Sequence, residues 1–346
     1  MLYDYCVIGN GLIGSSVALE LALKSKKVCV LGAAYGDEGK YFSSHEDDSR
    51  IARCWHTDPY WEGLARRNLE KIGALSRTTG INILRRTPVF YRCDSGFVPA
   101  TCSARPTDAE QSCNFAIKFN FEDVYGGIIE PKLYIAALNQ EARTLGADIF
   151  HAVVHEICWK EGRSAVQTSA GTFECRRVVD ARGMLAQTNH FDIEAEVLGK
   201  VLFYTEVPAQ MDHEIFCFLD CACQTDTFSD AYGIWNYRRN GDVTVSKFGF
   251  TERSPVKLKD TQQISAWFQR DYNRYPYSAA ATSLLAGLFC GNAYKLSIKP
   301  CAFVVTPDKR PAFLMKAEHA VITGCNGMAA KCCQAIAESF VDQWEV

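Results

Sequence analysis

The chain has 346 residues, enough to bury a large core and, by length, to form two domains. Its charged share of 22% and net charge of −3 give no basic excess of the kind that binds nucleic acid or anionic membranes. No uninterrupted apolar stretch reaches the roughly 18 residues that a membrane-spanning helix needs. We therefore expect a soluble protein with no nucleic-acid or membrane partner.

The 16 cysteines are scattered through apparent strands and helices, and no cleavable leader precedes the first strand-like run. This pattern predicts a cytoplasmic protein with mostly free thiols. Cys221 and Cys223 form one close pair and Cys332 and Cys333 another, but neither has the second Cys/His pair of a zinc site. We expect no metal.

The first elements in chain order are typical of a βαβ unit. A short apolar run at Tyr5–Ile8 meets a glycine-rich turn, apolar residues then recur at helical spacing, and a second apolar run follows at Val28–Leu31. The turn is the motif Gly9-Asn10-Gly11-Leu12-Ile13-Gly14, a G-x-G-x-x-G between a strand and a helix. This context predicts a dinucleotide-binding site, with a merely structural turn as the alternative.

Each glycine of the motif has a physical role in that prediction. Gly9 permits the tight turn, Gly11 lets a pyrophosphate approach the backbone, and Gly14 lets helix and strand pack closely. The helix N-terminus offers free N–H groups to the phosphates. The second strand lacks the acidic residue that usually binds the ribose, and Asp37 or Glu38 is the expected substitute.

Later elements resume the same sheet. A helix is predicted at Leu133–Leu145, followed by strands at Ile149–Val154 and Arg177–Ala181, and a strand, glycine turn and helix return at Ala320–Phe340. Aromatic-rich alternating strands fill the intervening segments. We predict an α/β fold, α+β overall, with a Rossmann-like nucleotide domain over 1–83, 128–200 and 299–346. A mainly antiparallel β substrate domain is predicted over 84–127 and 201–298.

On these blocks the chain resembles the D-amino-acid oxidase superfamily of FAD-dependent oxidoreductases, and most closely its monomeric sarcosine oxidase branch. The segment from Ser44 to Arg53 is similar to the family's flavin-facing segment. The resemblance implies that Ser44, His45 and Arg50 contact the flavin and that Arg53 binds the substrate carboxylate. The alternative is a solvated arginine pair on the surface.

Three further blocks carry the resemblance. The segments 126–131 and 178–183 are similar to the family's return to the nucleotide sheet, which implies cofactor contacts from Val154 and Gly183. The strand 243–250 resembles the one whose lysine activates oxygen, here Lys247. Counting by twos places Lys247 on one face with Val243 and Val245, whereas an ordinary surface lysine is the alternative.

The C-terminal part adds cofactor and substrate contacts to what the resemblance implies. Cys301 stands where sarcosine oxidases bond a cysteine sulfur to the flavin, with an unreactive buried cysteine as the alternative. Gly324 and Gly327 belong to a turn similar to the one that meets the flavin pyrimidine edge. Lys331 occupies the family's second carboxylate-binding position, with an ordinary helix-start lysine as the alternative.

The chain also departs from the family pattern. Thr251 and Met328 replace two active-site histidines of sarcosine oxidases, so the substrate need not be sarcosine. Trp235 and Tyr237 lie near the substrate-side aromatic position; we include Trp235 in the site as a pocket wall, although a strand aromatic is more often core.

The resemblance implies an FAD-dependent oxidoreductase that oxidises the C–N bond of an amino or imino acid to an imine. Dioxygen is the expected acceptor, and a buried cation at Lys247 suits that role. The alternatives are a dehydrogenase or flavoprotein subunit that passes electrons to a partner protein, a biosynthetic imine-forming oxidase, and a non-catalytic nucleotide-binding regulator.

Overall fold

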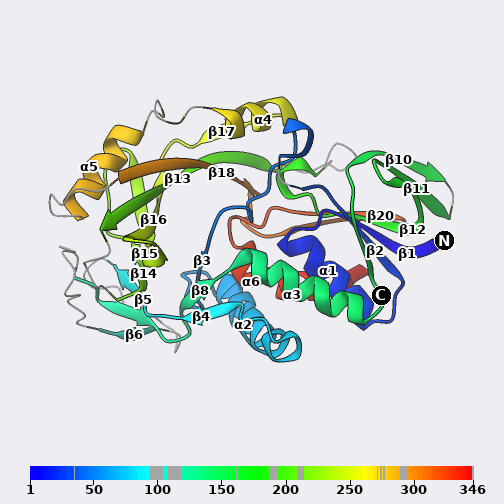
Figure 1. Cartoon of the computed structure of the whole chain (residues 1–346), viewed down its shortest axis with the longest axis horizontal. Coiled ribbons are helices and arrows are strands. Elements are labelled where there is room, and N and C mark those ends of the chain that lie inside the picture. Colours follow the sequence, from blue (N-terminus) through cyan, green and yellow to red (C-terminus); the bar gives the residue numbers. More distant parts are fainter. Residues whose placement is uncertain are drawn as a thin grey trace.

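The computed structural model describes residues 1–34, 36–93, 104–107, 118–160, 162–186, 194–208, 214–270, 272, 275, 277–288 and 295–344. Two large β-sheets form the two ends of an elongated molecule, and helices lie below the sheet that contains the N-terminal strand (Figure 1). The helices and 3₁₀ turns of this part of the chain are α1 (Leu12–Leu23), η1 (Asp37–Gly39), α2 (Pro59–Thr79), α3 (Pro131–Thr144), η2 (Gly183–Leu185), α4 (Thr261–Gln269), α5 (Ser278–Leu288) and α6 (Ala329–Trp344).

The first sheet carries the N-terminal glycine turn. Its strands, within the described ranges, are β1 (Leu2–Ile8), β2 (Val28–Gly32), β9 (Asp148–His151), β10 (Val154–Lys160), β11 (Arg163–Thr168), β12 (Gly171–Asp180), β19 (Ala312–Lys316) and β20 (His319–Thr323). The central strands β20, β12, β1, β2 and β9 pair in parallel, whereas β10 to β12 and β19 to β20 pair antiparallel. The predicted βαβ opening is therefore confirmed.

Helices α1, α2, α3 and α6 pack against one another and against the parallel strands in the main hydrophobic core (Figure 1). Apart from Glu20, which pairs with Lys71, helix α1 has apolar or small residues all round, and it is buried over most of its length. Such a helix fits only between other elements. This packing holds the N-terminus of α1 against the end of β1, where the predicted phosphate site lies.

The second sheet is aromatic-rich and mainly antiparallel, as predicted. Its strands in the described part of the chain are β5 (Val89–Arg92), β6 (Ala104–Pro106), β7 (Phe121–Asp123), β13 (Glu196–Pro208), β14 (Phe216–Asp220), β15 (Phe228–Asn240), β16 (Val243–Glu252), β17 (Val256–Leu258) and β18 (Lys295–Val305). Only the β14–β5 pairing among them is parallel. Phe203, Phe218, Phe248 and Phe250 lie in its core, and their alternation along the strands follows the two-residue period of β-structure.

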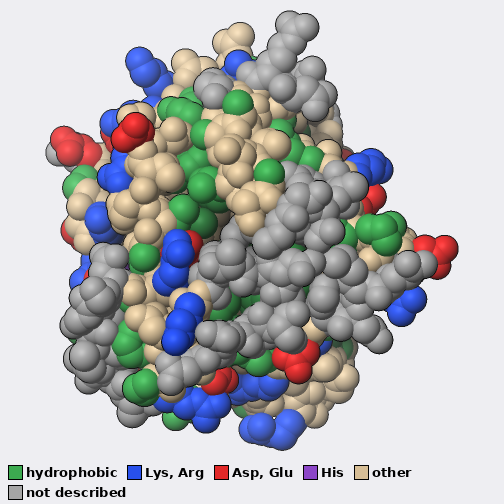
Figure 2. Space-filling view, turned by 90° about the vertical axis from the view of Figure 1, so that its left-hand side faces the viewer, with side chains coloured by type: hydrophobic (Ala, Val, Ile, Leu, Met, Phe, Trp, Pro, Cys, Tyr) green, Lys and Arg blue, Asp and Glu red, His purple; other side chains and the backbone are tan. Residues whose placement is uncertain are grey.

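A small sheet of β3 (Arg50–Ala52), β8 (Gly127–Ile129) and β4 (Leu84–Arg86) connects the two ends. Strand β18 crosses the predicted domain boundary at residue 299, because it pairs with β13 from Lys295 to Val305. The division of the chain into the predicted segments stays a prediction. Figure 2 shows the end formed by the second sheet, where Lys or Arg and Asp or Glu side chains both reach the surface beside hydrophobic ones.

Candidate functional site

A cavity of about 660 Å³ is lined by residues of both large sheets and of the loops that join them. The predicted site residues in its wall are Gly9, Gly11, Ser44, His45, Arg50, Arg53, Val154, Gly183, Lys247, Cys301, Gly324, Gly327 and Lys331. Residues that are more than 300 positions apart in the sequence therefore meet around one space. Of the predicted set, only Gly14 and Trp235 are outside this wall.

The N-terminal turn has the backbone geometry that its glycines predict. Gly9 has a φ of +107°, and a Cβ added there would lie 2.7 Å from the carbonyl oxygen of Ala181. A Cβ on Gly14 would lie 1.8 Å from the carbonyl oxygen of Gly9, so Gly14 acts beneath the turn, in helix–strand packing. Gly11 caps helix α1 without any side-chain hydrogen bond. The first N–H groups of α1 therefore remain available to an anion.

Crowding at the end of β2 explains why Gly32, and not an acidic residue, ends this strand. A Cβ on Gly32 would lie 2.4 Å from the Cβ of Asn10, so a larger side chain would displace the glycine turn. Asp37 does not replace the missing acid, because its carboxylate accepts a hydrogen bond from the Ala34 N–H and pairs with His151. Neither Asp37 nor Glu38 lines the cavity.

The C-terminal turn faces the same cavity. Gly324 and Gly327 both have positive φ angles, of +70° and +73°, and a Cβ on Gly324 would lie 2.4 Å from the Thr306 side chain. Helix α6 begins directly afterwards, at Ala329. The turn and the helix start thus bring backbone N–H groups and Lys331 to the cavity wall.

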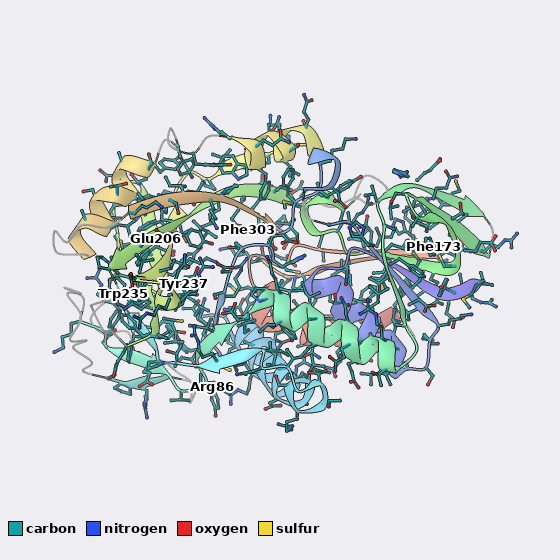
Figure 3. All side chains as sticks on the ribbon, viewed as in Figure 1. Arg86, Phe173, Glu206, Trp235, Tyr237 and Phe303 are labelled. Carbon is teal, nitrogen blue, oxygen red and sulfur yellow. The ribbon has the colours of Figure 1, made fainter. Side chains whose placement is uncertain are left out.

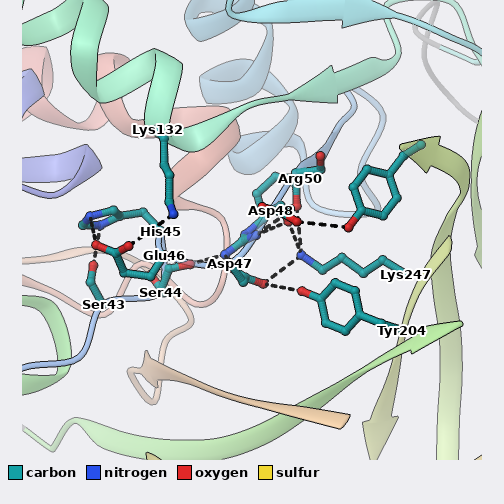
Figure 4. Close-up of polar contacts among 12 residues, drawn as sticks. Ser43, Ser44, His45, Glu46, Asp47, Asp48, Arg50, Lys132, Tyr204 and Lys247 are labelled. Atoms are coloured by element: carbon teal, nitrogen blue, oxygen red, sulfur yellow. Dashed lines mark hydrogen bonds and ion pairs between the residues drawn. The ribbon is translucent and has the colours of Figure 1, made fainter. Parts of the chain in front are cut away.

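Arg50 and Lys247 lie in one densely paired cluster (Figure 4). The Lys247 ammonium donates to Asp47 Oδ2 at 2.8 Å, to the Asp48 carbonyl at 2.6 Å and to the Ser49 carbonyl at 2.9 Å. The Arg50 guanidinium also pairs with Asp47 and donates to the Ser49 carbonyl at 2.9 Å. One carboxylate therefore serves two cations, the buried Lys247 and the partly exposed Arg50.

The pKa values in this cluster follow from burial and from the shared carboxylate. Burial and the nearby Arg50 charge lower the pKa of Lys247 to about 8, although Asp47 opposes the shift. For Asp47, burial alone would raise the pKa, but Arg50 and Lys247 together hold it below its usual value. Asp47 was missed by the sequence reading, because no local pattern shows that a loop acid meets a strand lysine 200 positions away.

Arg53 and Lys331 form a different kind of group. Lys331 is 5% exposed, and within the described residues neither side chain has a carboxylate within 4.0 Å. The Arg53 guanidinium donates a hydrogen bond to the Trp55 carbonyl at 2.9 Å, and it also lies at the Tyr91 hydroxyl, where it opposes the raising of the Tyr91 pKa by burial. Burial and the Arg53 charge lower the pKa of Lys331 to about 7. Two neighbouring cations thus line the cavity with no carboxylate at ion-pair distance in the described part of the chain.

Asp123 lies near this pair, because it opposes the lowering of the Lys331 pKa and because the Arg53 charge opposes the raising of its own pKa. Asp123 is buried and accepts hydrogen bonds from the backbone N–H groups of Trp55 and Tyr125, at 2.7 and 2.9 Å. Its pKa is raised by burial. His56 lines the cavity, and burial together with Arg53 and Lys331 lowers its pKa to about 3, so it is neutral. Within the described residues no carboxylate forms an ion pair with either cation, so both can still pair with an anion from outside the chain.

A protein-family model described as FAD dependent oxidoreductase (DAO) matches residues 4–275. The chain belongs to this family. No curated protein sequence matches it. The predicted resemblance to the D-amino-acid oxidase superfamily is confirmed, whereas the sarcosine oxidase branch stays a prediction.

Several solved structures share the fold of this FAD-dependent oxidoreductase. One is NikD, described as an unusual amino acid oxidase essential for nikkomycin biosynthesis, with a TM-score of 0.77 and 15% identity over 98% of this chain and 93% of that one. Another is L-proline dehydrogenase from P. horikoshii, with a TM-score of 0.74 and 16% identity over 98% and 92%. A third is glycine oxidase from Bacillus cereus, with a TM-score of 0.66 and 15% identity over 99% and 95%. At these identities the likeness shows the fold alone.

The cavity fits the FAD that the family requires. The crowded glycines Gly9 and Gly14 leave room for a backbone–phosphate contact at the uncapped start of α1. Gly11 and His45 lie together at this end, since a Cβ on Gly11 would be 3.4 Å from the imidazole Nδ1. Gly9 and Gly11 would hold the pyrophosphate, and the rest of the cavity extends toward Arg50 and Cys301.

Cys301 lies in β18 directly across from Lys200 in β13, and it lines the cavity. Burial, and then Asp47, raise the pKa of the Cys301 thiol, while Arg50 opposes the shift. The thiol is therefore protonated at neutral pH. Its carbonyl accepts a hydrogen bond from the Trp267 indole at 2.9 Å, which ties the strand to helix α4.

The placement of Trp235 in the site is wrong. Its ring packs between Phe216 and Phe248 in the core of the second sheet, and Figure 3 shows it toward the outer end of the molecule, away from Phe303 in the cavity wall. Tyr232 on the same strand lines the cavity instead. Successive strand residues face opposite sides, so the odd offset from Tyr232 to Trp235 turns the indole into the core. Sequence alone did not show which parity faces the cavity.

Two further findings bear on function. No group of three or more His, Cys, Asp or Glu side chains that could hold a metal ion occurs among the described residues. In the same residues, every helix is too short or too polar to cross a membrane.

Proposed function

We propose that this FAD-dependent oxidoreductase oxidises the C–N bond of an amino or imino acid to an imine, with dioxygen as acceptor and hydrogen peroxide as product. The observation that carries the proposal is the pair of cavity-lining cations, Arg53 and Lys331, without a carboxylate partner in the described structure. Two cations left unpaired in a buried site are costly unless a ligand supplies the anion.

The two cations would bind a substrate carboxylate in complementary ways. The Arg53 guanidinium offers a planar fork of donors, and the Lys331 ammonium offers a point charge. A bound carboxylate would raise the pKa of Lys331 from about 7 toward its ordinary value, because it replaces a repulsive environment by an attractive one. Anchoring the carboxylate would also orient the carbon that bears the amine.

When bound, FAD supplies the two-electron acceptor for the oxidised carbon. Lys247 and Arg50 would place positive charge near the negative charge that oxygen acquires in the second half-reaction. The cofactor would contact the other predicted residues that line the cavity, which are Ser44, His45, Val154, Gly183, Gly324 and Gly327.

Cys301 is proposed to hold the cofactor covalently. The raised pKa of the thiol means that it must lose its proton before the sulfur can bond to the cofactor. Acid precipitation tests the bond: the yellow colour should stay with the pellet of the wild-type protein and move to the supernatant of Cys301→Ser. Colour in the supernatant of both would contradict attachment at Cys301.

A dehydrogenase that passes electrons to a partner protein is the second candidate, and Asp47 favours it. The Asp47 carboxylate neutralises one of the two cations that would activate oxygen. The two candidates differ in the second half-reaction: an oxidase reoxidises rapidly in air, whereas a dehydrogenase prefers an artificial electron acceptor.

Anaerobic titration of the purified flavoprotein with a panel of amino and imino acids tests the proposed function. Bleaching of the flavin absorbance by amino or imino acids, but not by the matching amines without a carboxylate, is the expected result. Reduction by neutral amines in preference to their carboxylated counterparts, or by no member of the panel, would contradict the proposal.

A further inference from the structure

A second polar group lines the cavity and has no part in the functions assigned above. Among the described residues of the cavity wall, Glu46 and Asp230 are the only carboxylic acids, whereas several Lys and Arg side chains are present. Glu46 lies beside His45 and pairs with Lys132, at the end that carries the N-terminal glycine turn. Asp230 is thus the one described carboxylate on the side of the cavity formed by the second sheet.

Hydrogen bonds fix the orientation of Asp230. The Thr251 hydroxyl donates to Asp230 Oδ1 at 2.7 Å, and the Ser229 hydroxyl donates to Oδ2 at 3.1 Å. Asp230 and Thr251 are also paired residues of the neighbouring strands β15 and β16. No Lys or Arg side chain in the described ranges lies within 4.0 Å of this carboxylate. A carboxylate accepts about four hydrogen bonds, so acceptor capacity remains for a ligand.

A buried cation supports the far side of Thr251. Lys200 is 8% exposed, and its ammonium donates to the Thr251 hydroxyl at 3.4 Å. The ammonium also lies 5.1 Å from the ring centre of Tyr232 and 5.9 Å from that of Phe303. The donors therefore run in one direction, from Lys200 to Thr251 and from Thr251 to Asp230. This order leaves Asp230 as the acceptor at the end of the chain.

The position of Asp230 relative to Arg53 suits a substrate that carries both an acid and an amine. Cys221 follows β14 beside Asp230, because Asp220 pairs with Ala231. Arg53, Cys221 and Asp230 all line the same cavity. The cavity wall thus carries a cationic group at Arg53 and an acidic group at Asp230.

We propose that Asp230 is the subsite for the substrate nitrogen, which donates an N–H hydrogen bond to its carboxylate. The inference rests on the proposed function, because it assigns the second polar end of the same amino-acid substrate. Thr251 and Lys200 are positioning residues that keep the Asp230 carboxylate oriented. The ligand class is a primary or secondary amine that bears a carboxylate.

Two probes of nearly equal shape test the subsite in the flavin-loaded protein. The amino acid 2-methylalanine has no hydrogen on its α-carbon, so it binds without being oxidised. The carboxylic acid 2,2-dimethylpropanoate replaces its ammonium by a methyl group. Calorimetry at neutral pH should show that wild-type protein binds 2-methylalanine about tenfold to a hundredfold more tightly, the range for a hydrogen bond to a charged group.

The substitution Asp230→Asn should abolish this preference while the dissociation constant of 2,2-dimethylpropanoate stays within about twofold. Asp230→Ser provides a second variant in case the amide disturbs folding, and Thr251→Val should reduce the preference less than either. Asp226→Asn is the matched control, because it is the same substitution at an exposed residue of the neighbouring loop that does not line the cavity. This control should keep the full preference.

Three results would overturn the assignment. They are equal binding of both probes by wild-type protein, a preference that survives in both Asp230 variants, and an equal loss of affinity for both probes in those variants. The proposed function fails on a different measurement, the absence of anaerobic flavin reduction by the amino and imino acid panel. If the panel reduces the flavin but the Asp230 variants keep the preference, only the Asp230 assignment is wrong.

Discussion

Two groups of cations, each of one buried lysine and one partly exposed arginine, line the same cavity and differ in their charge partners. Arg50 and Lys247 share the Asp47 carboxylate, and loop carbonyls accept their remaining hydrogen bonds. Arg53 and Lys331 have no carboxylate within 4.0 Å in the described structure. The lysine of each group has a lowered pKa, of about 8 for Lys247 and about 7 for Lys331.

The difference distinguishes a group that the protein completes from one that a ligand completes. In the first, an internal carboxylate offsets the cost of burying two charges. In the second group, the cost remains until an anion binds. A binding site for a charged substrate therefore often lowers the free energy of unfolding of the ligand-free protein. We therefore expect charge removal to have opposite effects on stability in the two groups.

The largest expected effect comes from removing the shared carboxylate. Asp47→Asn keeps the shape of the side chain but leaves Arg50 and Lys247 without a counter-ion, which should lower the free energy of unfolding by about 3–5 kcal/mol. Urea denaturation at neutral pH measures the change. Lys331→Met is the control, because it removes a cation that has no partner and should leave stability equal or higher. An equal decrease in the free energy of unfolding in both variants would contradict the distinction between the two groups of cations.

Arg53→Met should cost about 2–5 kcal/mol of substrate binding, the range for breaking one side of a buried hydrogen-bonded charge pair. Steady-state kinetics with the best substrate of the panel measures the loss in kcat/KM. Part of it should appear in kcat, because the anchor also orients the reacting carbon. Unchanged kinetics in this variant would show that Arg53 does not bind the substrate carboxylate.

Lys247→Met should separate the two half-reactions. Reoxidation by oxygen should slow by about 10²–10³-fold, the usual cost of losing one electrostatic stabiliser, whereas anaerobic reduction should change less. Rapid mixing of reduced protein with oxygenated buffer measures the first rate, and anaerobic mixing with substrate measures the second. Rates of reoxidation that match those of the wild type would favour the dehydrogenase.

The smallest expected effect is a pH dependence of carboxylate binding. Lys331 is charged below its pKa of about 7, so affinity for a simple carboxylate should fall by up to tenfold per pH unit above it, until Arg53 alone retains the ligand. Stability of the ligand-free protein should change in the opposite sense. The pKa of this lysine in the unfolded chain is near 10.4. Between about pH 7 and that value the side chain is protonated in the unfolded chain but neutral in the folded protein, so the free energy of unfolding rises with pH. Inhibitor binding at pH 6 to 9, with Lys331→Met as a pH-independent control, measures the first effect.

Much of the nucleotide-binding half could be predicted because its signals are local. The run Tyr5–Ile8, the glycines that follow and the helical spacing after them define β1, the turn and α1 without reference to distant residues. The positive φ of Gly9 and the crowding at Gly14 follow from backbone sterics, which the residue type alone determines.

The substrate side was predicted less well because it depends on which strand face is turned inward. Trp235 and Tyr232 lie on one strand, and a register irregularity between Ile234 and Arg238 further obscures the count of alternating residues. Choosing between the two parities needs the packing of the neighbouring strands. Composition and spacing do not contain that information.

By itself the sequence determined the glycine turns, the order of elements and the identities of the candidate cations, because short-range sterics and residue chemistry decide them. Only the tertiary structure decided which charges are paired. Asp47 reaches Lys247 across 200 positions, Asp230 meets Thr251 across a strand pair, and Arg53 and Lys331 meet without an acid. The energy of a buried charge depends on its distance to every other charge, and those distances exist only after the chain has folded.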